Sequence, residues 1–191
     1  MTVELGRPRD RRIDSAVLEA TVELLGETGY ASLSVDAIAR RAGTSKPAIY
    51  RRWPSKAHLV HEAVFPLAED SALPDTGSVA GDVREMLRGT VEVLTTPAAR
   101  AALPGLVGEM AADATLHAAL LERFGRLLSR GLSDWLAAAV ARGQVRAEVT
   151  AADVVDAIAG ITFLALITHG DTLDEVWIDR TAELITRGIS A

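Results

Sequence analysis

The spacing of helix start and stop signals between Leu33 and Leu59 limits how this chain can fold more than any other feature. Ser34 and Ser45 are residues that favour the N-cap of a helix. Gly43 lies between them and suits a turn that needs a positive φ angle. Only about two helical turns, of roughly 3.6 residues each, fit before each break. The segment therefore predicts two short helices joined by a tight turn, the layout of a helix-turn-helix.

Composition and apolar spacing predict helices along the rest of the chain. The hydrophobic share is 49% and the aromatic share only 4%, and much of the apolar content is Ala and Leu, which favour helices. Ile13, Val17, Ala20 and Leu24 recur at helical spacing, and Gly29 follows them as a helix stop. A fourth helix is expected over 55–69, with Ser55 as its N-cap. Further helices are expected over 79–95, 98–112, 115–141, 151–168 and 174–189, with a linker at 71–78. We therefore expect an all-α protein of about nine helices.

Charge is divided unevenly between the two ends of the chain. Residues 1–60 carry 10 Lys and Arg against 7 Asp and Glu, whereas the remaining residues carry 10 against 19. The formal net charge is -6, so only the amino-terminal part has the sign that favours contact with phosphate. Residues 7–12, RPRDRR, add a basic arm without apolar periodicity. This asymmetry is typical of a protein that meets nucleic acid at one end.

Several other classes of protein are not supported. The chain has no cysteine, which excludes disulfides and thiolate metal sites. His58 and His61 share a helix face beside Glu62, but no further zinc ligand can be placed, so we expect neither metal nor cofactor. No Ser-His-Asp spacing or glycine-rich phosphate loop indicates an enzyme. No signal peptide or bilayer-spanning apolar run is recognised either, so we expect a cytoplasmic protein outside the membrane.

The second short helix carries side chains suited to phosphates and base edges. Its start and outer face present Thr44, Ser45, Lys46, Tyr50, Arg51 and Arg52. The inner faces of the two short helices form a small apolar seam of Ile38, Ala39, Ala42 and Ile49. Trp53 is expected to pack the third helix against the fourth rather than to contact a base.

Two parts of the sequence resemble a known family. The stretch Ile38–Lys56 reads I-A-x-x-A-G-T-S-x-x-x-I-Y-x-x-W-x-S-K and resembles the DNA-binding signature of the tetracycline-repressor (TetR) family. The segments at 103–113 and 142–149 are similar to an actinobacterial-type regulatory domain of that family. The resemblance implies a three-helix helix-turn-helix DNA-binding domain with a basic arm at 1–54. A larger helical ligand-binding and dimerisation domain is implied at 55–191, with a connecting helix at 55–70.

The resemblance also implies a set of DNA contacts. Those expected in the major groove and at its phosphates are Thr44, Ser45, Lys46, Pro47, Ala48, Tyr50, Arg51 and Lys56. The basic arm resembles extensions that reach the neighbouring minor groove, through Arg7, Arg9, Arg11 and Arg12.

The carboxyl-terminal helices are expected to form a dimer surface and a ligand cavity. Residues 154–167 are apolar nearly all round, which is more than one core-facing stripe requires. The expected dimer contacts are Ile158, Ile161, Ala165, Trp177, Leu184 and Ile185. Family members carry the cavity among the long helices, and its expected lining here is Met86, Val93, Leu106, Glu109, Met110, His117, Leu120, Phe124, Thr162 and Phe163.

These features predict a ligand-responsive DNA-binding transcriptional regulator that acts as a repressor. It would bind a palindromic operator in double-stranded DNA as a homodimer and be released by a small-molecule effector. A helical protein-interaction adaptor without DNA binding is the alternative. The salt dependence of duplex binding separates the two hypotheses.

Overall fold

The computed structural model describes residues 11–65, 73–170 and 173–191, without the side chains of 11, 121 and 123–130. Within these residues the protein is all-α, as predicted, and an isolated bridge between Val145 and Ser190 is its only β pairing. The helices are α1 (Arg11–Ser32), α2 (Val35–Arg41), α3 (Lys46–Tyr50), α4 (Lys56–Val64), α5 (Val79–Thr95), α6 (Pro97–Ala112), α7 (Ala114–Ala141), α8 (Ala151–His169) and α9 (Glu175–Ile189).

The helix starts in the amino-terminal part follow local hydrogen bonding. Ser34, Ser45 and Ser55 are extended N-cap residues, and each hydroxyl accepts a hydrogen bond from the amide three residues on. These bonds satisfy amides that have no partner within their helices. The three predicted caps are thereby confirmed.

The connecting helix is shorter than predicted. We expected it to run over 55–70, but α4 ends at Val64, and its C-cap, Phe65, leaves the helical region with φ -118° and ψ 70°. Phe65 precedes Pro66, and the residue before a proline is pushed out of the α conformation. The part of the predicted helix at 66–70 lies outside the described residues.

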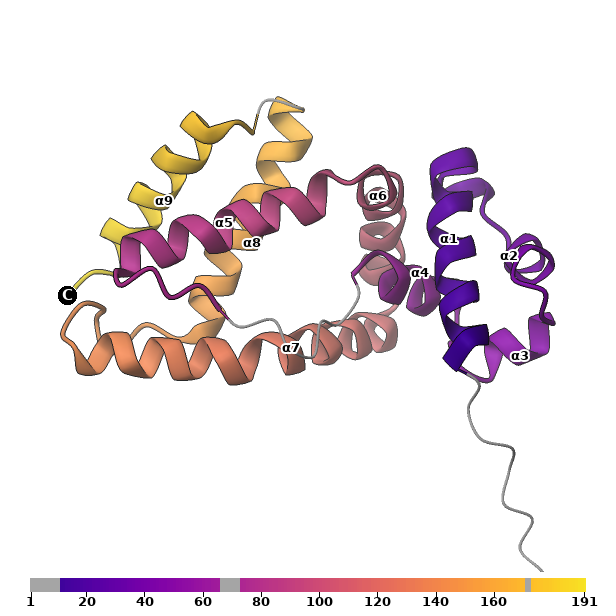
Figure 1. Ribbon diagram of the computed structural model, residues 1–191, viewed down its shortest axis with the longest axis horizontal. Coiled ribbons are helices and arrows are strands. Elements are labelled where there is room, and N and C mark those ends of the chain that lie inside the picture. The colour runs from indigo at the N-terminus through magenta and orange to yellow at the C-terminus, as the bar shows by residue number, and fades with distance from the viewer. Residues whose placement is uncertain (1–10, 66–72, 171–172) are drawn as a thin grey trace, which may run out of the picture. The chain divides into compact units, whose positions relative to one another are not determined.

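The chain forms two compact units. The first unit comprises residues up to Pro66 together with Ala101–Leu116, and the second comprises Leu67–Arg100 together with His117–Ala191. In the first unit α1 packs against both α4 and α2, and Figure 1 shows α1 between them. The buried apolar residues of these helices and their turns are Val17, Ala20, Leu24, Leu25, Tyr30, Leu33, Val35, Ile38, Ala39, Ile49, Trp53, Ala57, Leu59, Val60 and Val64. One shared core therefore holds α2 and α3 in place.

In the second unit α5 packs against α8 and α9. Val79, Val83, Leu87 and Val91 are spaced four residues apart on α5, so they form a single buried stripe. The core around this stripe contains Leu132, Leu136, Ala139, Val145, Val154, Ile158, Ala165, Leu173, Trp177, Ile178, Ala182, Ile185 and Ile189.

A buried carboxylate ties α5 to α7 within the second unit. Asp82 is 3% exposed. Its Oδ1 accepts hydrogen bonds from the amide of Thr76 at 2.7 Å and from the Thr76 hydroxyl at 2.8 Å. Its Oδ2 accepts one from the indole Nε1 of Trp135 at 2.8 Å. Burial alone would raise the pKa of Asp82, but these bonds and the charge of Arg142 outweigh it and lower that pKa.

The length of the apolar helix α8 contradicts the expectation that no apolar run is long enough to span a bilayer. Among the described residues, Ala151–His169 is long and apolar enough by length and composition to cross a membrane, although no such run was recognised in the sequence. Core helices of globular proteins pass the same test, and Val154, Ile158 and Ala165 contribute to the core described above. Only 22% of the most apolar window of α8 is buried, however. One face of this helix therefore remains uncovered in the single chain.

Candidate nucleic-acid interface

The turn between α2 and α3 brings two short helices together over a small apolar contact. Ile38 and Ile49 are almost fully buried, and Ala39 is 5% exposed, which allows close approach. Gly43 has a φ of 63°, in the left-handed region where a Cβ is unfavourable. The amide of Thr44 donates to the carbonyl oxygen of Ala39 at 2.9 Å and closes the turn. This is the helix-turn-helix geometry that the spacing predicted.

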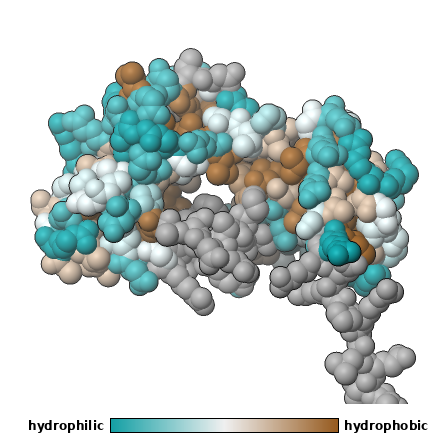
Figure 2. Space-filling view, viewed as in Figure 1, coloured by the Kyte–Doolittle hydropathy of each residue, from teal (hydrophilic) through white to brown (hydrophobic). Residues whose placement is uncertain are grey.

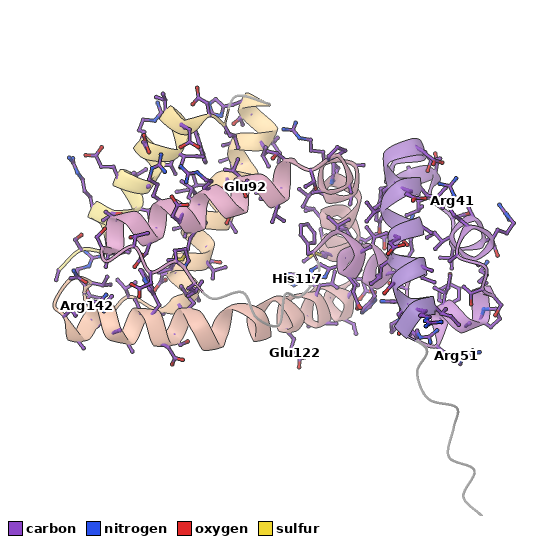
Figure 3. The ribbon with its side chains drawn as sticks, in the orientation of Figure 1. Arg41, Arg51, Glu92, His117, Glu122 and Arg142 are labelled. Atoms are coloured by element: carbon purple, nitrogen blue, oxygen red, sulfur yellow. The ribbon has the colours of Figure 1, made fainter. Side chains whose placement is uncertain are left out.

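The outer side of α3 is exposed along its whole length. Tyr50 is 42% exposed, although tyrosine is a residue that proteins often bury. The exposed predicted contacts are Ser45, Lys46, Pro47, Tyr50 and Arg51, whereas Thr44 and Ala48 are half-buried. Figure 3 shows Arg51 at the carboxyl end of α3, on the outside of the first unit. Most of the predicted reading residues therefore share one accessible surface.

Two arginines of the short helices are instead bound to α1. Arg41, labelled in Figure 3, lies at the end of α2 and makes a bidentate contact with Glu27. Its two terminal nitrogens donate to the two carboxylate oxygens at 2.6 and 3.0 Å. Arg52 follows α3, and its Nε lies 2.5 Å from the Asp14 carboxylate. The Arg52 and Asp14 side chains are only 22% and 28% exposed. These ion pairs position α2 and α3, so Arg52 does not lie on the free outer face that the sequence suggested.

Two exposed residues of α2 were not identified from the sequence as part of this surface. Arg40 is exposed near the end of the helix. Asp36, in the first turn, places its Oδ2 2.8 Å from Nζ of Lys46. Asp36 and Arg40 are four residues apart and so share one face of α2. That spacing is the signal that could have found them.

The structure places Lys56 against the end of α1. Its Nζ donates to the carbonyl oxygen of Tyr30 at 3.1 Å and lies 4.1 Å from the centroid of the Tyr30 ring. The second contact has cation–π geometry. Lys56 is half-buried, so a phosphate contact by its ammonium would compete with these two interactions.

Tyr30 also packs closely against α6 in the first unit. A Cβ added to Gly105 would lie 2.1 Å from Cδ1 of the Tyr30 ring, so only glycine fits at this crossing. Burial, and then the neighbouring Glu109 carboxylate, raise the pKa of Tyr30 above its ordinary range. The buried hydroxyl has no hydrogen bond of good geometry among the described residues. The crossing therefore combines close packing of the Tyr30 ring on Gly105 with a carboxylate near the Tyr30 hydroxyl.

The basic arm lies mostly beyond what the structure describes. Arg7 and Arg9 are outside the described residues, and so is the side chain of Arg11. Arg12 is exposed in the first turn of α1. The minor-groove role of the arm stays a prediction.

The residues expected to line a ligand cavity differ in their surroundings. Leu106 and Leu120 are 2% exposed, whereas Val93 is 45% exposed and His117 is exposed on α7 (Figure 3). Thr162 is fully buried, and its hydroxyl donates to the carbonyl oxygen of Ile158 on its own helix. The remaining expected residues are the half-buried Met86, Glu109, Met110 and Phe163, and Phe124, whose side chain is not described.

The expected dimer surface needs correction. The second unit buries four of its predicted residues in its own core, namely Ile158, Ala165, Trp177 and Ile185. Ile161 is half-buried, and only Leu184, at 65%, is well exposed. Two apolar residues of α8 that were not singled out from the sequence, Leu164 and Ile167, are 60% and 66% exposed. Figure 2 shows hydrophobic atoms at the surface near the carboxyl end of this helix.

The first unit has the groups that duplex DNA requires. Hydroxyl, amide, ammonium and guanidinium donors surround one short exposed helix, which is the size of element that enters the major groove. Among the described residues no cluster of three or more His, Asp or Glu side chains could hold a metal ion. Fold and surface together define a helix-turn-helix DNA-binding protein.

Comparison with known sequences supports the same class. A family model described as "Bacterial regulatory proteins, tetR family" matches residues 17–63. A second, "Tetracyclin repressor-like, C-terminal domain", matches residues 73–185. The chain belongs to the tetR family of bacterial transcriptional regulators.

Individual relatives cover nearly the whole chain. A Bacillus subtilis protein, the uncharacterized HTH-type transcriptional regulator YdeS, is 30% identical over 195 residues, which cover 100% of this chain and 96% of that protein. The DNA-binding transcriptional repressor TetR of Mycobacteroides abscessus is 31% identical over 175 residues, covering 88% and 89%. The crystal structure of the TetR family transcription regulator SCO0332 has a TM-score of 0.70 at 29% identity, covering 94% of this chain and 100% of that one.

Proposed function

We propose that this regulator is a cytoplasmic repressor that binds a palindromic operator as a homodimer and releases it when a small-molecule effector binds. The observation that carries the DNA-binding part is the exposed outer side of α3. Its side chains have no role in the core, yet the Arg41–Glu27 and Arg52–Asp14 ion pairs fix the backbone beneath them. A rigid helix with exposed polar side chains is suited to read base edges.

The DNA contacts are tested with duplexes that the full chain selects from a random-sequence library. Arg51→Ala should weaken binding to selected and random duplexes alike and reduce the slope of log affinity against log salt by about one. Tyr50→Ala should weaken binding to the selected duplex more than to the random one, because tyrosine has no charge to lose. Arg142→Ala, an exposed arginine that follows α7, is the matched control and should change neither.

The homodimer is supported by the uncovered face of α8. Leu164 and Ile167 are one turn apart on that face, and Leu184 is exposed on α9. Exposed apolar residues that gather in this way favour a protein contact. A dimer would also present two reading helices to successive major grooves, roughly 34–36 Å apart.

Sedimentation tests this part of the proposal. Ile167→Asp should shift the protein from dimer to monomer at micromolar concentration, because a dimer contact would bury its charge without a partner. Val107→Asp changes an exposed valine of α6 in the same way and should leave the dimer intact. A parent chain that is monomeric at these concentrations contradicts the proposal.

The effector response is supported by the match of residues 73–185 to the family's carboxyl-terminal domain. An apolar and cationic-amphiphilic compound library screened by thermal shift should yield a compound that also weakens DNA binding. Linkage then requires operator DNA to weaken compound binding by the same factor. If every compound that binds leaves DNA affinity unchanged, the effector part is wrong.

The adaptor hypothesis predicts a different outcome. A protein-binding module would bind duplex DNA weakly or not at all, and the Arg51→Ala variant would match its parent. The match of residues 17–63 to a family of DNA-binding regulators favours the repressor.

A further inference from the structure

One carboxylate lies on the otherwise cationic surface of α2 and α3. Asp36 is the only acidic residue between Val35 and Tyr50, and its side chain is 56% exposed. Its Oδ2 lies 2.8 Å from Nζ of Lys46, the first residue of α3, whose side chain is 46% exposed. The pair therefore belongs to the surface that we propose meets DNA.

Stability does not explain this carboxylate. Exposed ion pairs contribute little to folding, because solvent screens them and both side chains lose freedom. A negative charge in the first turn of α2 is favourable for that helix. This effect does not require the carboxylate to contact Lys46 of α3. The hydrogen bond that Lys46 donates to Asp36, and then the charge of that carboxylate, raise the pKa of Lys46.

Near DNA a carboxylate is repelled by every phosphate, whatever the base sequence. The acids of α1 that face the short helices are each held by an arginine, Asp14 by Arg52 and Glu27 by Arg41. Among the described residues, Asp36 is paired only with the exposed ammonium of Lys46. The repulsion between Asp36 and the phosphates weakens binding to every sequence. It is offset only where a base edge donates a hydrogen bond to the Asp36 carboxylate.

The major-groove edge of a C·G base pair offers the matching groups. The cytosine N4 amino group is a donor and the guanine O6 is an acceptor, and these two atoms lie about 3 Å apart because they bond to each other. Asp36 and Lys46 present an acceptor and a donor at nearly the same spacing, 2.8 Å. An A·T pair also offers a donor beside an acceptor. However, adenine N7 next to the donor would repel the carboxylate, and thymine lacks the second acceptor that guanine N7 gives a lysine.

We infer that Asp36 and Lys46 together read one C·G base pair in each operator half-site. Asp36 accepts from the cytosine amino group, and Lys46 donates to O6 and N7 of the guanine. This inference rests on the proposed DNA-binding function and adds Asp36 as a determinant of specificity. The carboxylate acts chiefly by penalising every other base pair at that position.

The test is selection of duplexes from a random library by the full chain, by Asp36→Asn and by Glu19→Gln. Glu19 is an exposed acid of α1, so its variant is the matched control for loss of one negative charge. The parent and Glu19→Gln should select the same site with a fixed C·G pair in each half. Asp36→Asn should select a site that is relaxed at that pair alone.

Direct binding then gives the magnitude. Exchange of the C·G pair for A·T should weaken binding of the parent by about 5- to 150-fold, the range for one good base contact. For Asp36→Asn the same exchange should cost at least about threefold less than for the parent, because the carboxylate is gone while Lys46 still donates to the guanine. If Asp36→Asn keeps the full preference for C·G, the inference is wrong.

A double variant distinguishes direct contact between Asp36 and the base pair from a role in which Asp36 only positions Lys46. In a Lys46→Ala background, Asp36→Asn should still relax the selected pair. If it has no effect there, Asp36 acts only by holding Lys46 and the inference is overturned. A parent chain that selects no sequence at all would instead contradict the proposed function itself.

Discussion

Replacement of Asp82 by asparagine should destabilise the second unit, although the side chain keeps its shape. The carboxylate accepts three hydrogen bonds, two at Oδ1 from Thr76 and one at Oδ2 from Trp135. An amide has one accepting oxygen and one donating nitrogen, so either orientation turns a donor toward a donor. Hydrogen bonds to charged groups contribute about 1.5–3 kcal/mol each, so we expect a loss of about 2–4 kcal/mol for Asp82→Asn.

Urea unfolding followed by circular dichroism measures this loss. Asp75→Asn removes the same charge seven residues away at an exposed position and should change stability by less than about 0.5 kcal/mol. Since the chain has two compact units, the transition that Asp82→Asn shifts should be assigned to the second. Equal midpoints for the two variants would refute the argument.

The pH dependence of the difference supplies a second check. The pKa of Asp82 is lowered in the folded protein, so its carboxylate stabilises the fold above the unfolded pKa, and that contribution is lost as pH falls through the folded value. The deficit of Asp82→Asn should therefore be full at neutral pH and shrink below about pH 4, near the ordinary aspartate pKa. A deficit that is constant down to pH 3 would mean that charge is not involved.

Other substitutions have matched controls in the same helices. Gly105→Ala should destabilise the first unit by about 1–3 kcal/mol, because the new Cβ meets the Tyr30 ring. Gly108→Ala on the same helix, with nothing within 4 Å of its added Cβ, should instead stabilise it by up to about 1 kcal/mol, and thermal melts compare the two. Thr150→Ala should cost about 1 kcal/mol in urea unfolding, because it removes the hydroxyl that caps α8 in a capping box with Asp153.

Features that depend on a few consecutive residues were predictable from the sequence. Ser34, Ser45 and Ser55 were recognised as caps because a hydroxyl reaches only the amide three residues on. Gly43 was recognised because its turn needs a positive φ angle. Trp53 was expected to pack rather than to read bases, and it is 4% exposed.

Features that depend on distant partners were not predictable. The partner of Lys56 is Tyr30, 26 residues earlier in the chain, and no local pattern links them. Likewise, α8 is apolar on all sides, so its composition could not show which face α5 covers. The predicted dimer residue Ile158 therefore lies on the covered face and the exposed Leu164 was missed. The exposure of α3 was predictable because so short a helix has only one buried residue, Ile49.

The close crossing of Tyr30 and Gly105 also has a consequence at the level of the gene. Every glycine codon begins with GG, and the third base does not change the amino acid. Any single-base change at the first two positions that still encodes an amino acid adds a Cβ, and at Gly105 that atom would meet the Tyr30 ring. Every amino-acid replacement that one base change can produce at this codon therefore brings a Cβ against the Tyr30 ring. At the codon for Gly108, three residues on, the added Cβ would meet nothing within 4 Å.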